Sequence, residues 1–407
     1  MLRSFRLGNH RSFHDEQELL LVPAMPGDSR PAVPVAAIYG ANASGKSNLL
    51  DGLTYMAVGV LTSKVLGAWP RGIFRLDAQA PGLPSTFVIE ILAEGTRYTY
   101  GFRASDDAVV EEWLYAYPEK RRRVVFERTG DELRFGSTSS GLRSKFTALE
   151  ELIRGDVLVL SFCSGLELGP LMPVYRWFER ILRITSVEGP WASDEVGSRV
   201  GNFLQRDTRN SRRLLSLLAA ADVGIEDVIA ERIDEPAGHQ ETRLLPRPGP
   251  VSGPRWRLAF LHRKADAPFE LHEESAGTRN WLRLIPTVLD ALDEGQVLIV
   301  DEIDSSLHPM LTARLVGLFQ AEETNPNGAQ LIFTTHDTSL LGTMLGDSVL
   351  ERDQVWFVDK NAEGASELYP LTDFKPRKDQ NTERRYLAGS YGAVPVLDDF
   401  AEAVLGR

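Results

Sequence analysis

A short glycine-bearing motif near the N-terminus has the residue types needed to hold a nucleotide. It reads G-x-x-x-x-G-K-S from Gly40 to Ser47, directly after an apolar run that ends at Ile38. Glycines let the backbone N–H groups curl around phosphate oxygens, and a helix that starts at the end of the motif adds its positive pole. In such a loop Lys46 reaches the β- and γ-phosphates, and the Ser47 hydroxyl faces a Mg²⁺ ion. The spacing therefore predicts a phosphate-binding loop.

Two carboxylates follow another apolar run, far along the chain. The segment 296–302 reads Q-V-L-I-V-D-E and ends in Asp301 and Glu302. If this segment is a buried strand, it brings Asp301 beside the loop, where the carboxylate can hold Mg²⁺ together with Ser47. Glu302 is then placed to orient or deprotonate an attacking water. An apolar run that ends in acidic residues is by itself weak evidence for a metal or catalytic site. The phosphate-binding loop predicted elsewhere in the chain strengthens this interpretation.

A histidine and a serine–glycine pair complete the predicted site. His336 ends the apolar segment 331–335, and ligands bind outside the carboxyl ends of strands in open α/β sheets. We therefore expect His336 to contact the γ-phosphate. Ser275 and Gly277 lie at a predicted helix start, which is another anion-binding end, although a serine there is also an ordinary N-cap.

Alternating strands and helices position these residues. From residue 269 onward, the hydrophobic patterns predict a strand, then a helix at 279–293, a strand at 296–301, a helix at 309–321, a strand at 329–334, a helix at 338–345 and a strand at 354–358. Such alternation indicates a parallel sheet covered by helices. In the first part of the chain, two short strands precede the loop, a helix follows it at 49–66, and an antiparallel meander of about five strands starts near residue 87.

The middle of the chain is predicted to be inserted into one α/β domain. We expect a short buried strand at 157–160, a mostly helical region over 170–230 and an exposed loop at 236–254, which is rich in Pro and Gly. The predicted parts are therefore a first lobe with the loop and the meander (1–168), a helical and loop insertion (169–270), and a second lobe with the predicted signature, the acidic pair, His336 and a C-terminal segment (271–407).

Composition and charge limit the function classes. The 407 residues carry a formal net charge of −12 and one cysteine, Cys163, which we expect to be packed inside. A single cysteine excludes an internal disulfide and fits a reducing compartment. No run approaches the ~18 apolar residues of a membrane span, and the first residues resemble a strand, so we expect a cytoplasmic protein without membrane contact. The acidic balance disfavours nucleic acid as a partner without excluding it, and the basic clusters at 120–123 and 206–213 are interpreted as solvated surface.

Together the motifs resemble those of ABC-type ATPases of the RecF and SMC kind. The segment 5–13 is similar to their first hairpin, Ser275-Ala276-Gly277 to a degenerate ABC signature, Asp301-Glu302 to the Walker B pair, the segment from Asp304 to His308 to the D-loop, and His336 to the switch histidine. The residues similar to Walker A are Gly40, Asn42, Ala43, Ser44, Gly45, Lys46, Ser47 and Asn48. The resemblance implies an α/β ABC-type core with an antiparallel β subdomain, nucleotide contacts from these segments, and hydrolysis of ATP with Mg²⁺.

A narrower resemblance covers nearly the whole chain. The segments 274–278, 306–309, 334–337, 352–357 and 386–395 resemble bacterial RloA/AbiLi-like ATPases of abortive-infection and restriction-linked phage defence. That resemblance implies a separately encoded effector, such as a nuclease or toxin, under the control of this chain. The last of these segments is expected to pack on the core, with docking of a partner as the alternative.

In the ABC arrangement, Ser275 and Gly277 of one copy approach the γ-phosphate held by Lys46 of another, so the resemblance implies a homodimer or a higher oligomer. Two departures stand against the ABC pattern. No Gln follows segment 157–160, where ABC enzymes place one beside Mg²⁺ and water, and the signature lacks the LSGGQ form. The alternatives left open are a RecF-like DNA-repair ATPase and a weakly hydrolysing, ATP-bound scaffold.

Overall fold

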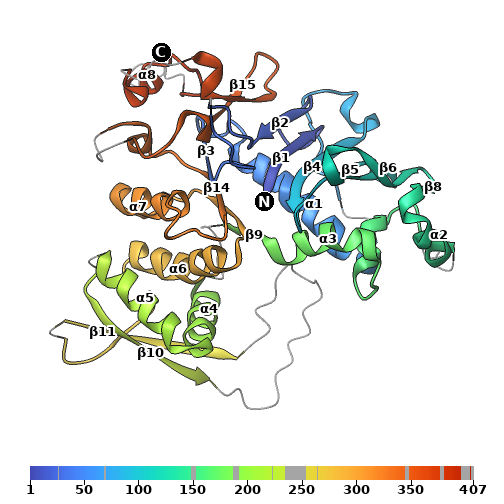
Figure 1. The fold of residues 1–407 in the computed structure, drawn as a ribbon. Coiled ribbons are helices and arrows are strands. Elements are labelled where there is room, and N and C mark those ends of the chain that lie inside the picture. The colour runs from blue at the N-terminus through green and yellow to red at the C-terminus, as the bar shows by residue number, and fades with distance from the viewer. Residues whose placement is uncertain are drawn as a thin grey trace.

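A computed structural model of the chain describes residues 1–25, 27–67, 70–147, 153–186, 192–221, 223–233, 254–263, 265–343, 348–375, 380–395 and 404. Three sheets organise this part of the chain (Figure 1). The loop predicted at 236–254 lies outside the described residues except for residue 254.

The central sheet has six strands and carries the predicted site. Its order is β16(Ser366–Pro370), β15(Val355–Lys360), β3(Val35–Tyr39), β14(Gln330–Thr334), β13(Val297–Asp301) and β9(Leu182–Ser186). All neighbours pair in parallel except β16, which is antiparallel to β15. Every residue of β3 and β14 is buried, as expected for parallel strands covered on both faces. The predicted parallel sheet is confirmed.

The two faces of the central sheet bury two different cores. Side chains of a strand alternate between faces. Thus Ala36 and Ile38 of β3 face the core that contains α1(Lys46–Leu66), whereas Val35, Ala37 and Tyr39 face α6(Ala276–Glu294) and α7(Pro309–Gln320). Figure 1 shows α6 and α7 on one side of the sheet and α1 on the other. The first and last parts of the chain therefore share one α/β unit.

The N-terminal part adds a seven-stranded antiparallel sheet beside α1. Its order is β2(Gln17–Leu20), β1(Leu2–Gly8), β4(Ser85–Ala93), β5(Thr96–Ala104), β6(Val109–Tyr117), β7(Arg123–Thr129) and β8(Glu132–Phe135). Strands β4 to β8 follow one another as neighbours, so the predicted five-stranded meander is confirmed. Together with the central sheet, this confirms the expected fold class, an α/β P-loop core with an antiparallel β subdomain. Short helices α2(Ser140–Thr147) and α3(Met172–Arg176) follow the meander.

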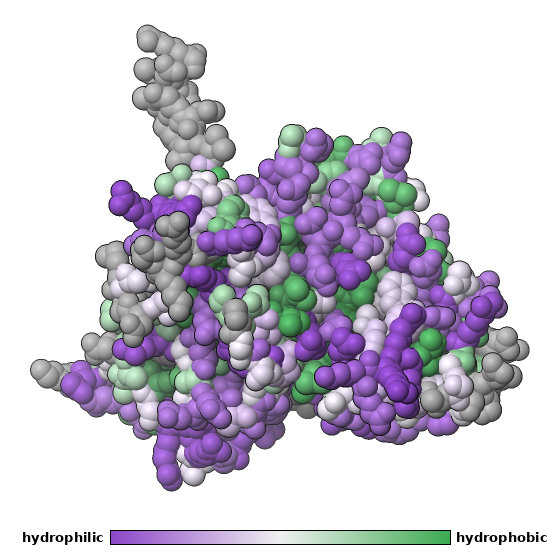
Figure 2. All heavy atoms as spheres, turned by 45° about the horizontal axis from the view of Figure 1, so that its top comes forward, coloured by the Kyte–Doolittle hydropathy of each residue, from purple (hydrophilic) through white to green (hydrophobic). Residues whose placement is uncertain are grey.

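Helix α1 is the one helix in the described part of the chain that is long and apolar enough to span a membrane by those criteria alone. A core helix meets the same criteria, and Leu49, Leu53, Met56 and Val60 of α1 are fully buried in the first core. Polar residues cover most of the molecular face that Figure 2 shows, with only small, separate apolar groups between them.

The strand predicted at 157–160 is wrong, because Val159–Cys163 forms a 3₁₀ turn. The backbone N–H groups of residues 158–160, at its start, bond to side chains instead of to a neighbouring strand. The Glu112 carboxylate accepts from Val159 N at 2.7 Å and from Leu160 N at 3.1 Å, and the Ser63 hydroxyl accepts from Leu158 N at 3.2 Å. Cys163 is buried, as expected, and burial raises the pKa of its thiol to about 12.

The region predicted as an insertion differs from its expected helical character. Strand β9 pairs with β13 and completes the central sheet, although its sequence continues the helical pattern before it. Helices α4(Ala192–Arg206) and α5(Thr208–Ala220) follow, and then a three-stranded antiparallel sheet of β10(Ile225–Ile233), β11(Arg255–His262) and β12(Phe269–Glu270). The strand expected near 269 thus belongs to this small sheet, and the helix expected at 338–345 is a 3₁₀ turn, Thr338–Leu341, within the described residues.

The C-terminal segment packs on the central sheet, as predicted. The rings of Tyr386, in α8(Thr382–Leu387), and Tyr391 stack on Phe357 of β15 with centroid distances of 5.4 and 5.7 Å. Ala393 N donates to the Asp359 carboxylate at 2.7 Å, and the Tyr386 hydroxyl donates to Ala393 O at 2.9 Å. These contacts fix the segment against β15, on the face of the sheet that bears the second core.

Replacement of Tyr391 tests this packing. Tyr391→Ala should lower the free energy of unfolding by about 3 kcal/mol or more, because it empties a site that holds a buried aromatic ring. Tyr391→Phe should change it by less than about 1 kcal/mol, since the buried hydroxyl has no hydrogen-bond partner among the described residues. Thermal and urea unfolding measure both variants, and equal destabilisation by the two would contradict the packing argument.

Candidate nucleotide-binding site

The loop between β3 and α1 is a tight curl that only small residues allow. Gly45 has a φ of 118°, and a Cβ there would collide with the hydroxyls of Ser12 and Ser366. A Cβ on Gly40 would collide with Val358 O and the Ser44 hydroxyl. Ala43 also has a left-handed backbone, with a φ of 62°. The glycines at both ends of the predicted motif are therefore required by the shape of the loop.

Lys46 lies across this loop and is almost fully buried, with 6% of its surface exposed. Its ammonium donates to Gly40 O at 3.0 Å and to Ala41 O at 3.1 Å. Burial lowers the pKa of Lys46, while the carboxylates of Glu302, Asp301 and Asp304 act in the opposite direction. Asp301 and Glu302, which were predicted from the other half of the chain, therefore lie close enough to Lys46 to affect its pKa.

Asp301, at the end of β13, is directly joined to the loop. The Ser47 hydroxyl donates to Asp301 Oδ1 at 3.2 Å, and the Thr334 hydroxyl donates to the same oxygen at 2.5 Å. Thr334 also accepts from Glu302 N at 2.7 Å. Sequence reasoning missed Thr334, although its place at the end of the neighbouring strand β14 was a usable signal.

The donor set fits Mg²⁺. Hydroxyl and carboxylate oxygens are the ligands that this ion prefers, and it usually keeps several waters and takes phosphate oxygens as well. No group of three or more His, Cys, Asp or Glu side chains could hold a metal among the described residues. Ser47 and Asp301 would therefore form the protein's share of a shell completed by phosphates and water.

The residues after β13 and β14 are linked to each other. Glu302 has a φ of 52°, a left-handed conformation that is uncommon for a side-chain-bearing residue and clusters at functional sites. Asp304 accepts from His336 N at 3.2 and 3.3 Å through its two carboxylate oxygens. Burial, followed by the positive charge of Lys46, lowers the pKa of His336. Lys46, Asp301, Glu302, Asp304 and His336 thus converge at one edge of the sheet.

A depression of about 400 Å³ adjoins the loop. Its lining includes Arg11, Ser12, Asn48 and Lys360. The Asn48 amide donates to the Ser12 hydroxyl at 2.8 Å, and the Ser366 hydroxyl donates to the same oxygen at 2.7 Å. Ser366 belongs to β16 and lies in no recognisable sequence motif, so its contact with the loop was not predicted. The depression is continuous with the loop through Ser12 and Asn48.

The predicted signature residues lie apart from this cluster. The Ser275 hydroxyl caps α6 by accepting from Thr278 N at 3.1 Å. A Cβ on Gly277 would lie 2.7 Å from Ser306 O, so the start of α6 packs closely on the segment 304–308. Among the described residues, neither Ser275 nor Gly277 hydrogen-bonds to the loop at 40–47.

Comparison with known proteins agrees with this geometry. Residues 35–342 match the family described as "AAA domain, putative AbiEii toxin, Type IV TA system". The chain belongs to this family. The predicted relationship to defence-associated ATPases is therefore confirmed at the level of the family. No protein among the curated sequences matches the chain.

The comparison with solved structures finds SMC head domains. An SMC head bound to the C-terminal winged-helix domain of ScpA shares 14% identity, with a TM-score of 0.46, over 92% of this chain and 99% of that chain. The SMC head domain from Thermotoga maritima shares 13% identity, with a TM-score of 0.42, over 91% and 98%. An SMC head from Pyrococcus furiosus bound to the C-terminal domain of ScpA shares 14% identity, with a TM-score of 0.42, over 92% and 97%.

The lowered pKa of His336 can be measured. In ¹³C-histidine NMR titrations, His336 should titrate below its ordinary value of 6.5, because burial and Lys46 both disfavour its charged form. Lys46→Met should raise the His336 pKa, since one neighbouring positive charge is lost. The variant His336→Asn assigns the signal, and a His336 that titrates above 6.5 in the unmodified chain would contradict the geometry.

Proposed function

We propose that this chain binds and hydrolyses ATP with Mg²⁺, and that ATP joins two copies into a switch that controls a separate effector protein in phage defence. The observation that supports hydrolysis is the convergence of Lys46, Ser47, Asp301, Glu302 and His336 at the carboxyl edge of β3, β13 and β14. The defence role rests on the family match and on the resemblance to RloA/AbiLi-like ATPases.

Each residue has a role in the proposed reaction. The loop N–H groups and Lys46 bind the phosphates, and Lys46 exchanges its contacts with Gly40 O and Ala41 O for phosphate oxygens. Ser47 and Asp301 hold Mg²⁺, which neutralises charge on the phosphates. Glu302 accepts a proton from the attacking water, and His336, uncharged near neutral pH, donates a hydrogen bond to the γ-phosphate. Asn42, Ala43, Ser44 and Asn48 shape the cradle, and the depression beside Ser12 receives the ribose and base.

The signature residues support a dimer in this proposal. Ser275 and Gly277 are held at the start of α6, away from the loop of their own chain, so they would act on the nucleotide of a second copy. The segment 304–308 contacts both parts of the proposed site. Asp304 accepts a hydrogen bond from His336 N, and Ser306 O packs against Gly277 at the start of α6. ATP would then favour the associated state, and hydrolysis would release it, by a shift of population. We place this switch in the cytoplasm.

A weakly hydrolysing scaffold is the second candidate, and one observation favours it. The turn at 159–163, where ABC enzymes carry their Gln, is buried, and its Ser161 hydroxyl donates to Leu158 O at 2.6 Å. A RecF-like DNA-repair role has less support, because the net charge is −12 and two arginines of the basic cluster, Arg206 and Arg213, are paired with Asp290 and Asp293.

Substitution of the proposed general base separates hydrolysis from binding. Glu302→Gln should lower the rate of ATP turnover by roughly 10²–10⁴-fold and leave ATP binding nearly unchanged, because the side chain keeps its size. Phosphate release and nucleotide titration measure the two effects. The matched control Glu322→Gln changes an exposed carboxylate after α7 and should have wild-type turnover. Unchanged turnover in Glu302→Gln would show that the assignment is wrong.

A pair of substitutions at the N-cap tests the dimer. Both Asp and Asn are good N-caps, so Ser275→Asp and Ser275→Asn should fold alike. Only the aspartate places a negative charge against the phosphates of the second copy. It should weaken ATP-dependent dimerisation of the Glu302→Gln protein by at least about tenfold, as measured by light scattering after size exclusion. If both variants dimerise equally well, the signature does not face the partner's nucleotide.

A further inference from the structure

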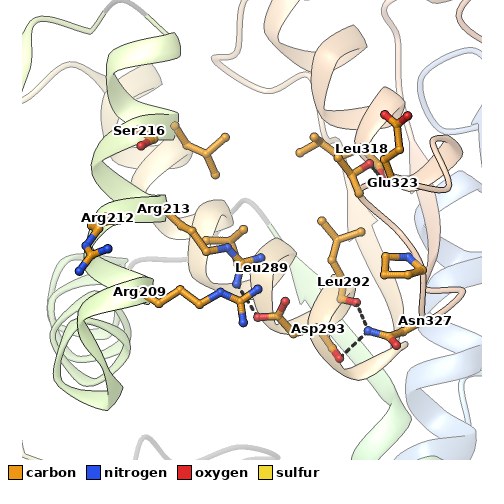
Figure 3. A pocket seen from close by; sticks show the side chains of 13 residues that line it. Arg209, Arg212, Arg213, Ser216, Leu289, Leu292, Asp293, Leu318, Glu323 and Asn327 are labelled. Carbon is orange, nitrogen blue, oxygen red and sulfur yellow. Dashed lines mark hydrogen bonds and ion pairs between the residues drawn. The ribbon is translucent and has the colours of Figure 1, made fainter.

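A groove with an apolar floor lies between α5 and the C-terminal half of α6. It encloses about 680 Å³, a volume typical of ligand pockets of ~300–1,000 Å³. Residues 323–327, between α7 and β14, form part of the opposite wall (Figure 3). The side chains that form the apolar part are Leu217, Leu289, Leu292 and Leu318. None of the lining residues belongs to the nucleotide site described above.

The rim of the groove on α5 is positively charged. Arg213 is paired with Asp293 across the groove at 2.6 Å. Arg209 and Arg212 are exposed and form no ion pair with any described residue. Figure 3 shows Arg209 extended over the groove toward Asp293, with Arg212 on the outer side of α5. In a chain of net charge −12, this rim is a local site for negative charge beside an apolar floor, in which Leu217 and Leu318 are partly exposed and Leu289 and Leu292 are nearly buried.

We propose that this groove binds an acidic peptide segment of a partner protein, with a leucine or aromatic side chain seated on the four leucines and a carboxylate against Arg209. Amphipathic peptides dock in such helix-walled grooves through apolar anchors, and complementary charge fixes their orientation and speeds their encounter. The partner is the effector of the proposed function, so the inference rests on that proposal for the biological role. The binding itself requires no nucleotide.

The lining favours a peptide over a nucleic acid. Proteins that bind single strands stack bases on aromatic side chains, and the lining residues include none. A carboxylate-bearing peptide with an apolar anchor matches both the leucine floor and Arg209, which has no ion-pair partner among the described residues.

The position of the groove connects it to the signature. Helix α6 begins just after Ser275 and presents Leu289, Leu292 and Asp293 to the groove near its other end. The ion pairs Arg206–Asp290, at 2.7 Å, and Arg213–Asp293 tie α4 and α5 to α6. A bound peptide therefore contacts the helix whose first turn faces the second copy in the proposed dimer.

Selection of peptides against the full chain, without nucleotide, tests the proposal. Random short peptides displayed on phage should be enriched for Asp or Glu combined with Leu, Phe or Trp. A fluorescein-labelled enriched peptide should bind at least about tenfold more weakly to Arg209→Glu, because the substitution reverses the charge that it meets. Leu318→Asn should also weaken binding. The matched control Arg121→Glu makes the same charge change in the other basic cluster and should leave binding unchanged.

Each other outcome overturns the proposal. It fails if no peptide is enriched, or if the enriched peptides bind Arg209→Glu as well as they bind the unmodified chain. It fails if a labelled oligonucleotide binds and only Arg209→Glu abolishes that binding, since the surface then belongs to nucleic acid. It also fails if Arg209→Glu abolishes self-association in the absence of ATP, since the occupant is then a second copy. Because no assay here uses ATP, a chain without ATPase activity that still binds the peptide refutes only the proposed function.

Discussion

The parallel register of β3, β14 and β13 is the constraint on which the nucleotide site depends. Ile332 of β14 lies opposite Ala36 of β3 and Ile299 of β13, so all three strands end at the same edge. Those ends deliver the loop, Thr334 and Asp301 to within hydrogen-bond distance of one another, although they come from opposite parts of the sequence. A shift of one residue in any of these pairings would turn buried side chains to the other face. The two apolar cores therefore fix the register, and the register fixes the site.

The two cores on either side of the central sheet contain different elements of the chain. The core around α1 holds the antiparallel sheet, the turn at 159–163 and α3, whereas the other core holds α4, α5, α6 and α7. The central sheet is the layer shared by both. Residues that meet the nucleotide lie at the edge of this shared layer, while the groove and the signature both belong to elements of the second core.

The sequence was informative where a residue type is dictated by one physical need. Gly45 needs a left-handed backbone, and the apolar run before Asp301 needs burial on both faces, so both were predictable. Strand β9 was not, because Leu182, its first residue, continues the helical spacing before it, and the strand is defined by its pairing with β13. The 3₁₀ turn at 159–163 is formed by Glu112, which is distant in sequence. Thr334 could have been found from its place at the end of a predicted strand, whereas Ser366 contacts Ser12 only in the folded chain and no spacing in the sequence identifies it.

Glu112 joins the antiparallel sheet to the turn at 159–163 through hydrogen bonds. Its buried carboxylate accepts from two amides of the turn and from the Tyr100 hydroxyl, while the neighbouring Arg128 guanidinium donates to Val157 O at 2.6 Å. Separating these partners would strand polar groups without water, at a cost of several kcal/mol. Release of this turn from the antiparallel sheet therefore carries that cost, so we expect the two to move together rather than separately.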